Sequence, residues 1–143
     1  MKNKTQKAIA LYMAAGLYAR YDMLRITDKS AWQAKNALIM KHIYPLPKAN
    51  KNPLVEQANR VKSDKYFKAS LCAKMKSLPI PTYKPSYMLN HGMGAVLKQL
   101  KAKAKKEGKS LPEGVNINDK NSLKENYDPK KLWKESLKKT GLC

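Results

Sequence analysis

Residues 5–26 read TQKAIALYMAAGLYARYDMLRI, and this stretch decides the fold. Apolar side chains recur in it at four-residue steps, as at Ile9, Met13 and Leu17, which is the spacing of one face of an α-helix. The small residues 14–16 would let a second helix approach closely. The run is too short to cross a bilayer, and no clean signal-peptide cleavage site follows it. We therefore predict that it forms the first helix of a folded core.

Prolines and capping residues divide the rest of the chain into helical blocks joined by short linkers. Asp28 can cap a second helix that ends before Pro45, and Asn52, which precedes a proline, can start a third. A change in the phase of the apolar pattern at Ser63-Asp64 predicts a break there. Residues 79–85 contain three prolines and should be extended. The sequence thus predicts an all-α fold, a small irregular bundle of about five helices with proline-rich extended linkers and a short C-terminal docking helix.

The helix expected to begin at Ser86 has the clearest amphipathic pattern, and Gly108 supplies its stop. Lysines fall mostly on its other faces. We expect one side of this helix to be buried and another to present lysines. The apolar stripe consists of Leu89, Met93, Val96, Leu97, Leu100 and Ala104.

We predict that the chain divides into a basic helical core at 1–108 and a polar loop plus docking helix at 109–143. The loop is expected at 109–127, where glycine and asparagine are frequent. Asp128 followed by proline is a good helix start. The apolar face of this last helix is predicted to dock on a neighbouring protein subunit through Leu132, Trp133 and Leu137.

Charge is the strongest compositional signal in the chain. Its 143 residues include 30 Lys+Arg and 10 Asp+Glu, for a net charge of +20, while 43% of the residues are hydrophobic, enough for a core. The excess is +7 in residues 1–50, +7 in 51–100 and +6 in 101–143. A compact protein holds such a charge against self-repulsion, and a polyanionic partner would relieve it.

Lysine dominates the basic residues, and arginine occurs at Arg20, Arg25 and Arg60. Lysine is a flexible point charge that suits phosphate backbones, whereas arginine supplies the planar fork that reads guanine edges. The composition therefore favours contact with nucleic acid that does not depend on base sequence, and it leaves DNA and RNA undistinguished. The alternative is coding bias, although a net charge of about 2–8 is enough to keep a small domain soluble.

Two groups of residues are the candidates for contact with nucleic acid. Tyr83 and Tyr87 flank Lys84 and are the aromatic side chains best placed to stack on bases, although tyrosine is also common at protein interfaces. The densest lysine cluster is the predicted phosphate-binding site. Its alternative role is to complement the negative end of the helix dipole. The cluster consists of Lys98, Lys101, Lys103, Lys105, Lys106 and Lys109.

The sequence carries no clear motif of a metal site, a disulfide scaffold or a catalytic centre. Cys72 and Cys143 stand 71 positions apart, and neither histidine lies at zinc-site spacing from them, so we expect no disulfide, no metal and a reducing compartment. The sequence Gly108-Lys109-Ser110 resembles the end of a phosphate-binding loop but lacks the earlier glycine. No pair of carboxylates suggests acid–base catalysis. We therefore expect a protein that is not an enzyme and has no cofactor.

Two functional hypotheses follow from these patterns. The first is a basic structural subunit of a large nucleic-acid-containing assembly, either a virion or a ribonucleoprotein. It would contact nucleic acid through lysines and neighbouring subunits through its linkers and last helix. The second is a protein–protein assembly element whose charge matches acidic neighbours. Attachment to an anionic membrane is a weaker third, since only the helix after Ser86 has a suitable pattern. No transmembrane segment is predicted, and we expect a virion or cytoplasmic particle, not a secreted protein.

Overall fold

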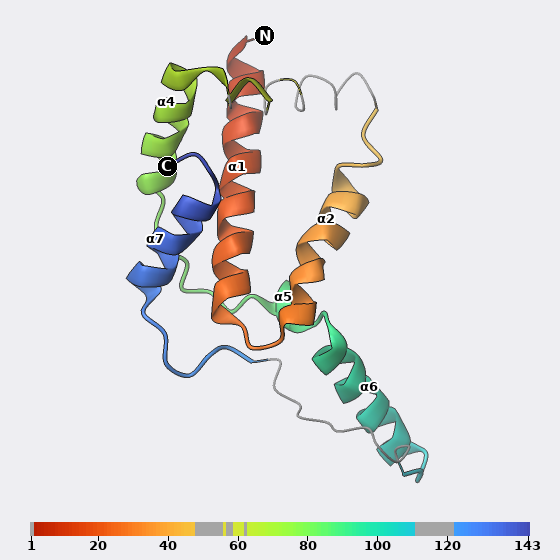
Figure 1. The fold of residues 1–143 in the computed structure, drawn as a ribbon. Coiled ribbons are helices and arrows are strands. Elements are labelled where there is room, and N and C mark those ends of the chain that lie inside the picture. Colours follow the sequence, from red (N-terminus) through yellow and green to blue (C-terminus); the bar gives the residue numbers. More distant parts are fainter. Residues whose placement is uncertain (1, 48–55, 57–58, 62, 111–121) are drawn as a thin grey trace.

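The computed structural model describes residues 2–47, 56, 59–61, 63–110 and 122–143, and the regular elements in these ranges are helical (Figure 1). The all-α prediction is therefore confirmed, and five of the described helices have nine or more residues. None of the helices in these ranges is long and apolar enough to cross a membrane. The elements are α1 (Lys2–Arg25), the 3-10 helix η1 (Lys29–Gln33), α2 (Ala34–His42), α4 (Lys65–Lys76), α5 (Ser86–Leu89), α6 (Met93–Lys106) and α7 (Pro129–Lys139).

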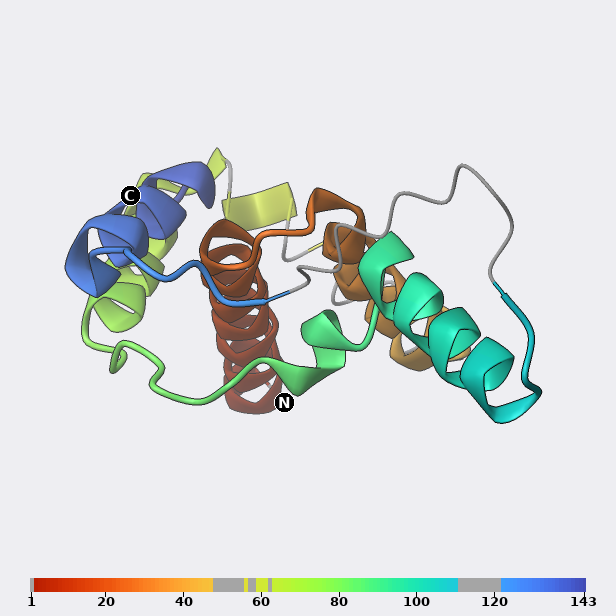
Figure 2. The same cartoon turned by 90° about the horizontal axis from the view of Figure 1, so that it is seen from below.

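Helix α1 runs through the middle of the fold, as its pattern predicted. Helices α4 and α7 lie on one side of it and α2 on the other (Figures 1 and 2). The face towards α4 and α7 buries Ile9, Leu17 and Tyr21 in the main apolar cluster. A second, smaller cluster forms around Ile26 and Met88, where η1, α2 and α5 meet.

Aspartates cap the N-termini of three helices at the positions predicted from the sequence. The carboxylate of Asp28 accepts a hydrogen bond from the Ser30 N–H at 2.8 Å and caps η1, so the second block begins as a 3-10 helix. Asp64 accepts from the Phe67 N–H at 2.9 Å, which confirms the predicted break before α4. Asp128 likewise caps α7. The helix start predicted at Asn52 and most of the loop predicted at 109–127 lie outside the described residues.

Helix α7 packs within its own chain. Trp133 and Leu137 are buried in the main cluster, and the Trp133 ring lies 5.5 Å from that of Tyr18 and 5.6 Å from that of Tyr21. Leu132 packs beside them, partly buried. The prediction that these side chains dock on a neighbouring subunit is therefore wrong. The apolar face was recognised correctly, but α1 covers it, and residues 129–143 belong to the same core as α1.

A buried ion pair lies at the C-terminal end of α1. The side chains of Asp22 and Arg25 are 0% and 1% exposed, and the Arg25 Nη2 and Nε atoms donate to Asp22 Oδ1 at 2.7 and 3.0 Å. Two tyrosine hydroxyls, from Tyr83 and Tyr87, donate to the other carboxylate oxygen at 2.9 and 2.8 Å. Four donors thus satisfy a charge that would otherwise be costly to bury.

The two tyrosines belong to the extended linker and to α5, so this carboxylate fixes the path of the chain between α4 and α6. Burial raises the pKa of both tyrosine hydroxyls above the usual value, and the neighbouring Asp22 charge raises it further. The hydroxyls therefore stay protonated at neutral pH and remain donors to the carboxylate.

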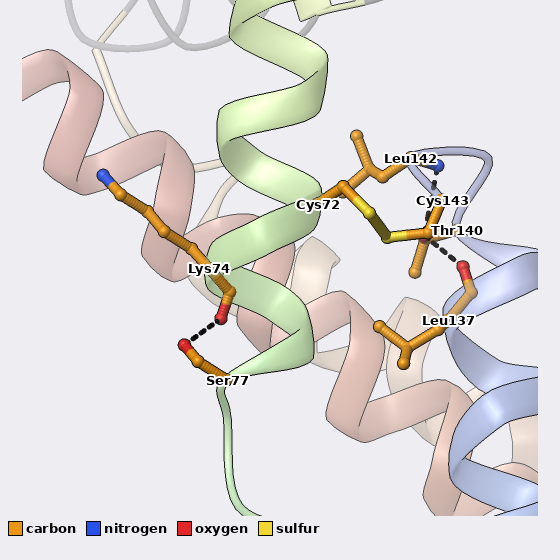
Figure 3. Close-up of a disulfide and its surroundings, with 7 residues drawn as sticks. All are labelled: Cys72, Lys74, Ser77, Leu137, Thr140, Leu142 and Cys143. Carbon is orange, nitrogen blue, oxygen red and sulfur yellow. Dashed lines mark hydrogen bonds between the residues drawn. A yellow bond between two sulfur atoms is a disulfide. The ribbon is translucent and has the colours of Figure 1, made fainter.

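The expectation of no disulfide is wrong. Cys72 of α4 and Cys143 form a disulfide, with their Cα atoms 5.4 Å apart (Figure 3). The chain turns back after α7 through Gly141, at φ 70°, and buries Leu142 beside α4. Thr140 holds this turn, since its Oγ1 donates to the Leu137 carbonyl at 2.6 Å and accepts from the Leu142 N–H at 3.2 Å. Sequence spacing gave no sign of this proximity, because it arises from the packing of α7 on α1.

The disulfide should contribute substantially to stability. It closes a loop over a sequence separation of 71 residues, and chain entropy predicts about 4 kcal/mol for a loop of that size. We expect Cys72→Ser/Cys143→Ser to lower the free energy of unfolding by up to that amount in urea titrations. Reduced wild-type protein is the matched control and should unfold like the double variant. Two titratable thiols in the denatured, unreduced protein would contradict the disulfide.

The buried carboxylate should be the most sensitive single position. Asp22→Ala leaves the Arg25 guanidinium buried without its partner, which costs about 3–5 kcal/mol. Tyr87→Phe removes one hydrogen bond to a charged group and should cost about 1.5–3 kcal/mol. Tyr66→Phe, at an exposed tyrosine, is the control and should leave urea unfolding unchanged. Equal stability of the Tyr87 and Tyr66 variants would show that the hydroxyl bond contributes nothing.

Candidate nucleic-acid interface

The predicted phosphate-binding lysines lie on and just after α6, whose first turn is held by the connection between α1 and α2. The Met93 N–H donates to Ser30 Oγ at 2.7 Å, and the Gly94 N–H donates to Asp28 Oδ2 at 3.0 Å. Partial burial acts to raise the pKa of Asp28, but hydrogen bonds from Ser30, Gly94 and Ala31 outweigh it and lower this pKa. The carboxylate therefore stays charged and caps η1 and α6 together.

Gly92 makes this close approach feasible. Its backbone has φ 88° and ψ 177°, a region that is essentially restricted to glycine. A Cβ at this position would lie 2.6 Å from the Ala31 nitrogen and 2.7 Å from Asp28 Oδ2. The continuous helix expected from Ser86 is therefore wrong, because α5 ends at Leu89 and the chain bends sharply before α6.

Beyond its first turn, α6 projects away from the rest of the molecule (Figures 1 and 2). Its buried residue is Ala95, and α6 packs against η1. The predicted burial of the apolar stripe is wrong for its main members, because Met93, Val96 and Leu100 are 59%, 47% and 49% exposed. The sharp turn at Gly92 sets which face of α6 packs against η1, and it directs the apolar stripe towards solvent.

All six predicted lysines are exposed. Lys98, Lys101 and Lys105 follow each other at three- and four-residue steps and so form one face of α6. Lys103 and Lys109 lie 4.0 and 3.0 Å from the carboxylate of Glu107. Within the described part of the chain, the other four lysines form no ion pair. The structure therefore presents a row of positive charge along the projecting helix that no described carboxylate compensates at Lys98, Lys101, Lys105 and Lys106.

The helix dipole accounts for part of this cluster. Lys103, Lys105 and Lys106 lie in the last turn of α6, where a positive charge is stabilising by about 0.3–1 kcal/mol. Lys98 and Lys101 lie before that turn, and the dipole effect falls off within one turn. These two lysines are therefore the members of the cluster that a structural role at the helix end does not explain.

Lys84 joins this face from the preceding linker. A hollow of about 900 Å³ lies between α5, α6 and residues 122–123, and both Lys84 and Lys98 line it, together with the polar residues Asn90 and Gln99. The sequence places Lys84 beside the tyrosines but does not reveal its proximity to α6. That proximity depends on the bend at Gly92.

Tyr83 and Tyr87 are held by contacts within the chain. Their hydroxyls bind Asp22, and the Arg25 guanidinium lies 5.1 Å from the centre of the Tyr83 ring. These contacts account for both tyrosines structurally. Stacking on a base stays a prediction, and Tyr83 is the more exposed of the two rings.

Neither a metal site nor a similarity to known proteins provides evidence about the function of this chain. In residues 2–47, 56, 59–61, 63–110 and 122–143, no three His, Cys, Asp or Glu side chains are grouped so that they could hold a metal ion. The sequence matches no protein-family model, and no curated protein or solved structure matches the chain. Function is therefore inferred from the residues and their geometry.

The direction of α6 should depend on Gly92. We expect Gly92→Ala to release the first turn of α6 from η1, because the added Cβ meets the Ala31 nitrogen and the side-chain oxygens of Asp28 and Ser30. The backbone conformation itself costs a residue other than glycine about 1–3 kcal/mol. Hydrogen exchange of the amides of residues 93–106 would then accelerate. Gly108→Ala is the matched control, since Gly108 also has a positive φ but a Cβ there meets nothing within 4 Å. Unchanged exchange in the Gly92 variant would contradict this attachment.

Proposed function

We propose that the protein binds nucleic acid through the lysine face of α6, as a non-enzymatic structural subunit of a nucleic-acid-containing particle. The observation that carries the proposal is the row of Lys98, Lys101 and Lys105 on a helix that projects from the body and has exposed lysines without ion-pair partners in the described structure. Such a row can follow a phosphate backbone, whose charges repeat at short intervals.

The proposed contact is electrostatic and independent of base sequence. Lysine lacks the planar fork that reads base edges bidentately, and α6 contains no arginine, asparagine or aromatic residue. The exposed Gln99 is the one amide side chain of α6 that could reach a base edge. Binding of this kind positions a protein on a duplex or a single strand without selecting a site.

A second candidate function is that of a protein–protein assembly element, and the apolar stripe of α6 supports it. Met93, Val96 and Leu100 lie on a different face of α6 from the lysine row, and exposed apolar side chains in a row are typical of docking surfaces. The two functions are compatible, since one helix could contact phosphate on one face and a neighbouring subunit on another. The wide spread of positive charge suits an acidic neighbour as well.

The decisive measurement is the salt dependence of binding to random-sequence DNA and RNA. We expect tight binding at low salt and a steep linear loss of log affinity with log salt concentration. Lys98→Gln/Lys101→Gln/Lys105→Gln should reduce the slope on duplex DNA by about 2–3, because each lost phosphate contact removes about 0.9. The same variant should weaken binding at least about tenfold near 0.1 M salt.

A matched control variant distinguishes nucleic-acid binding at α6 from a general effect of net charge. Lys130→Gln/Lys131→Gln/Lys134→Gln removes three exposed lysines from α7 and should leave most of the affinity and slope intact. Equal losses in the two triple variants would contradict an interface on α6. Negligible binding of the wild-type protein at low salt would contradict the nucleic-acid proposal and leave the assembly element. Val96→Ser/Leu100→Ser should leave nucleic-acid binding unchanged.

A further inference from the structure

An apolar groove lies between α1 and α2, and Thr140, at the C-terminal end of α7, also lines it. The two helices converge near η1 and diverge towards the start of α1 (Figure 1). The groove has a volume of about 340 Å³, and its walls include Tyr12 and Met13 of α1 and Leu38 and Ile39 of α2. This volume lies at the lower end of the range of about 300–1,000 Å³ that is typical of small-molecule sites.

The floor of the groove is formed by small residues. Ala15, Gly16 and Ala19 lie along one side of α1, and a Cβ added at Gly16 would meet nothing within 4 Å. No side chain in the described structure therefore fills the space over this glycine. The distance along α1 from Tyr12 to Arg20 is about 12 Å at a rise of 1.5 Å per residue. A chain of about ten carbons has a comparable length.

Two cations stand at the end of the groove near the junction of the helices. Arg20 lies in the last turns of α1 and Lys35 at the start of α2, and both side chains are partly buried. Burial lowers the pKa of the Lys35 ammonium, and the positive charge of Arg20 lowers it further. These like charges therefore destabilise each other in a partly desolvated place.

No acidic group relieves this repulsion in the described structure. The lining of the groove contains no aspartate or glutamate, and neither Arg20 nor Lys35 forms an ion pair with a described residue. By contrast, the buried Asp22 is paired with Arg25, and the partly buried Asp28 accepts hydrogen bonds from backbone donors. The groove thus combines an apolar length with a cationic end that an anion would neutralise.

We propose that this groove binds a single-chain anionic amphiphile of the fatty-acid class. Its carboxylate lies between Arg20 and Lys35, where two charge-assisted hydrogen bonds are available. Its alkyl chain lies over Gly16 towards Tyr12 and His42, at the open end of the groove. This site is independent of the lysine face of α6, so either can be present without the other.

The test uses the full-length, disulfide-bonded protein and calorimetric titration with sodium decanoate below its micelle concentration. Decyltrimethylammonium has the same alkyl chain with a positive head group and serves as the ligand control. We expect decanoate to bind at least tenfold more tightly than this cation. Arg20→Gln/Lys35→Gln should weaken decanoate binding at least tenfold and abolish the preference for it.

Two further variants distinguish the groove from adsorption to a cationic surface. Gly16→Leu fills the floor of the groove at a position with open space, should remain folded, and should abolish decanoate binding. Lys74→Gln/Lys76→Gln removes two exposed charges from α4 and should leave decanoate binding unchanged. Absence of decanoate binding to the wild-type protein, or binding that both Gly16→Leu and Arg20→Gln/Lys35→Gln leave unchanged, would overturn the proposal. Equal weakening by the two double variants would also overturn it, because it would indicate diffuse attraction.

Discussion

The carboxylate of Asp22 is the interaction on which the rest of the fold depends. It is fully buried and accepts hydrogen bonds from Arg25 in its own helix and from two tyrosines more than sixty residues away. Helices α4 and α7 pack on α1 through apolar side chains, and apolar packing tolerates small shifts. The linker after α4 contains three prolines and packs Leu78 and Ile80 against the main cluster. The directional bonds from Tyr83 and Tyr87 to this carboxylate fix the position of its later part.

Acidic and basic side chains therefore have different roles in this structure. Four of the ten acidic residues hold the fold together, because Asp22 ties the linker to α1 and Asp28, Asp64 and Asp128 cap helices. Within the described structure, none of these four carboxylates forms an ion pair with a lysine, and Asp64 lies 3.8 Å from Arg60. The amount of unpaired positive charge on the described surface therefore depends on where the acids are placed as well as on how many lysines there are, and α6 shows it most clearly.

Local features could be predicted from the sequence, whereas features that depend on packing could not. The caps at Asp64 and Asp128 and the stop at Gly108 depend on neighbouring residues, and these predictions were confirmed. The break at Gly92 is invisible locally because its cause is Asp28 and Ser30, more than sixty residues earlier. The groove and the disulfide require knowledge of which helices are neighbours. The stacking role of the tyrosines stays a prediction, and the exposure of the six lysines fits their proposed role without testing it.

The covalent bond between Cys72 and Cys143 has a consequence for the integrity of the chain. Both the linker and α6 lie within the loop that this bond closes. A protease that cleaves after lysine would find accessible sites on the projecting helix, where the lysine side chains are exposed. A single cut there would separate the peptide chain into two pieces that stay joined through sulfur. The nicked protein would keep α4 and α7 together on α1, and its fragments would part when the bond is reduced and the core unfolds.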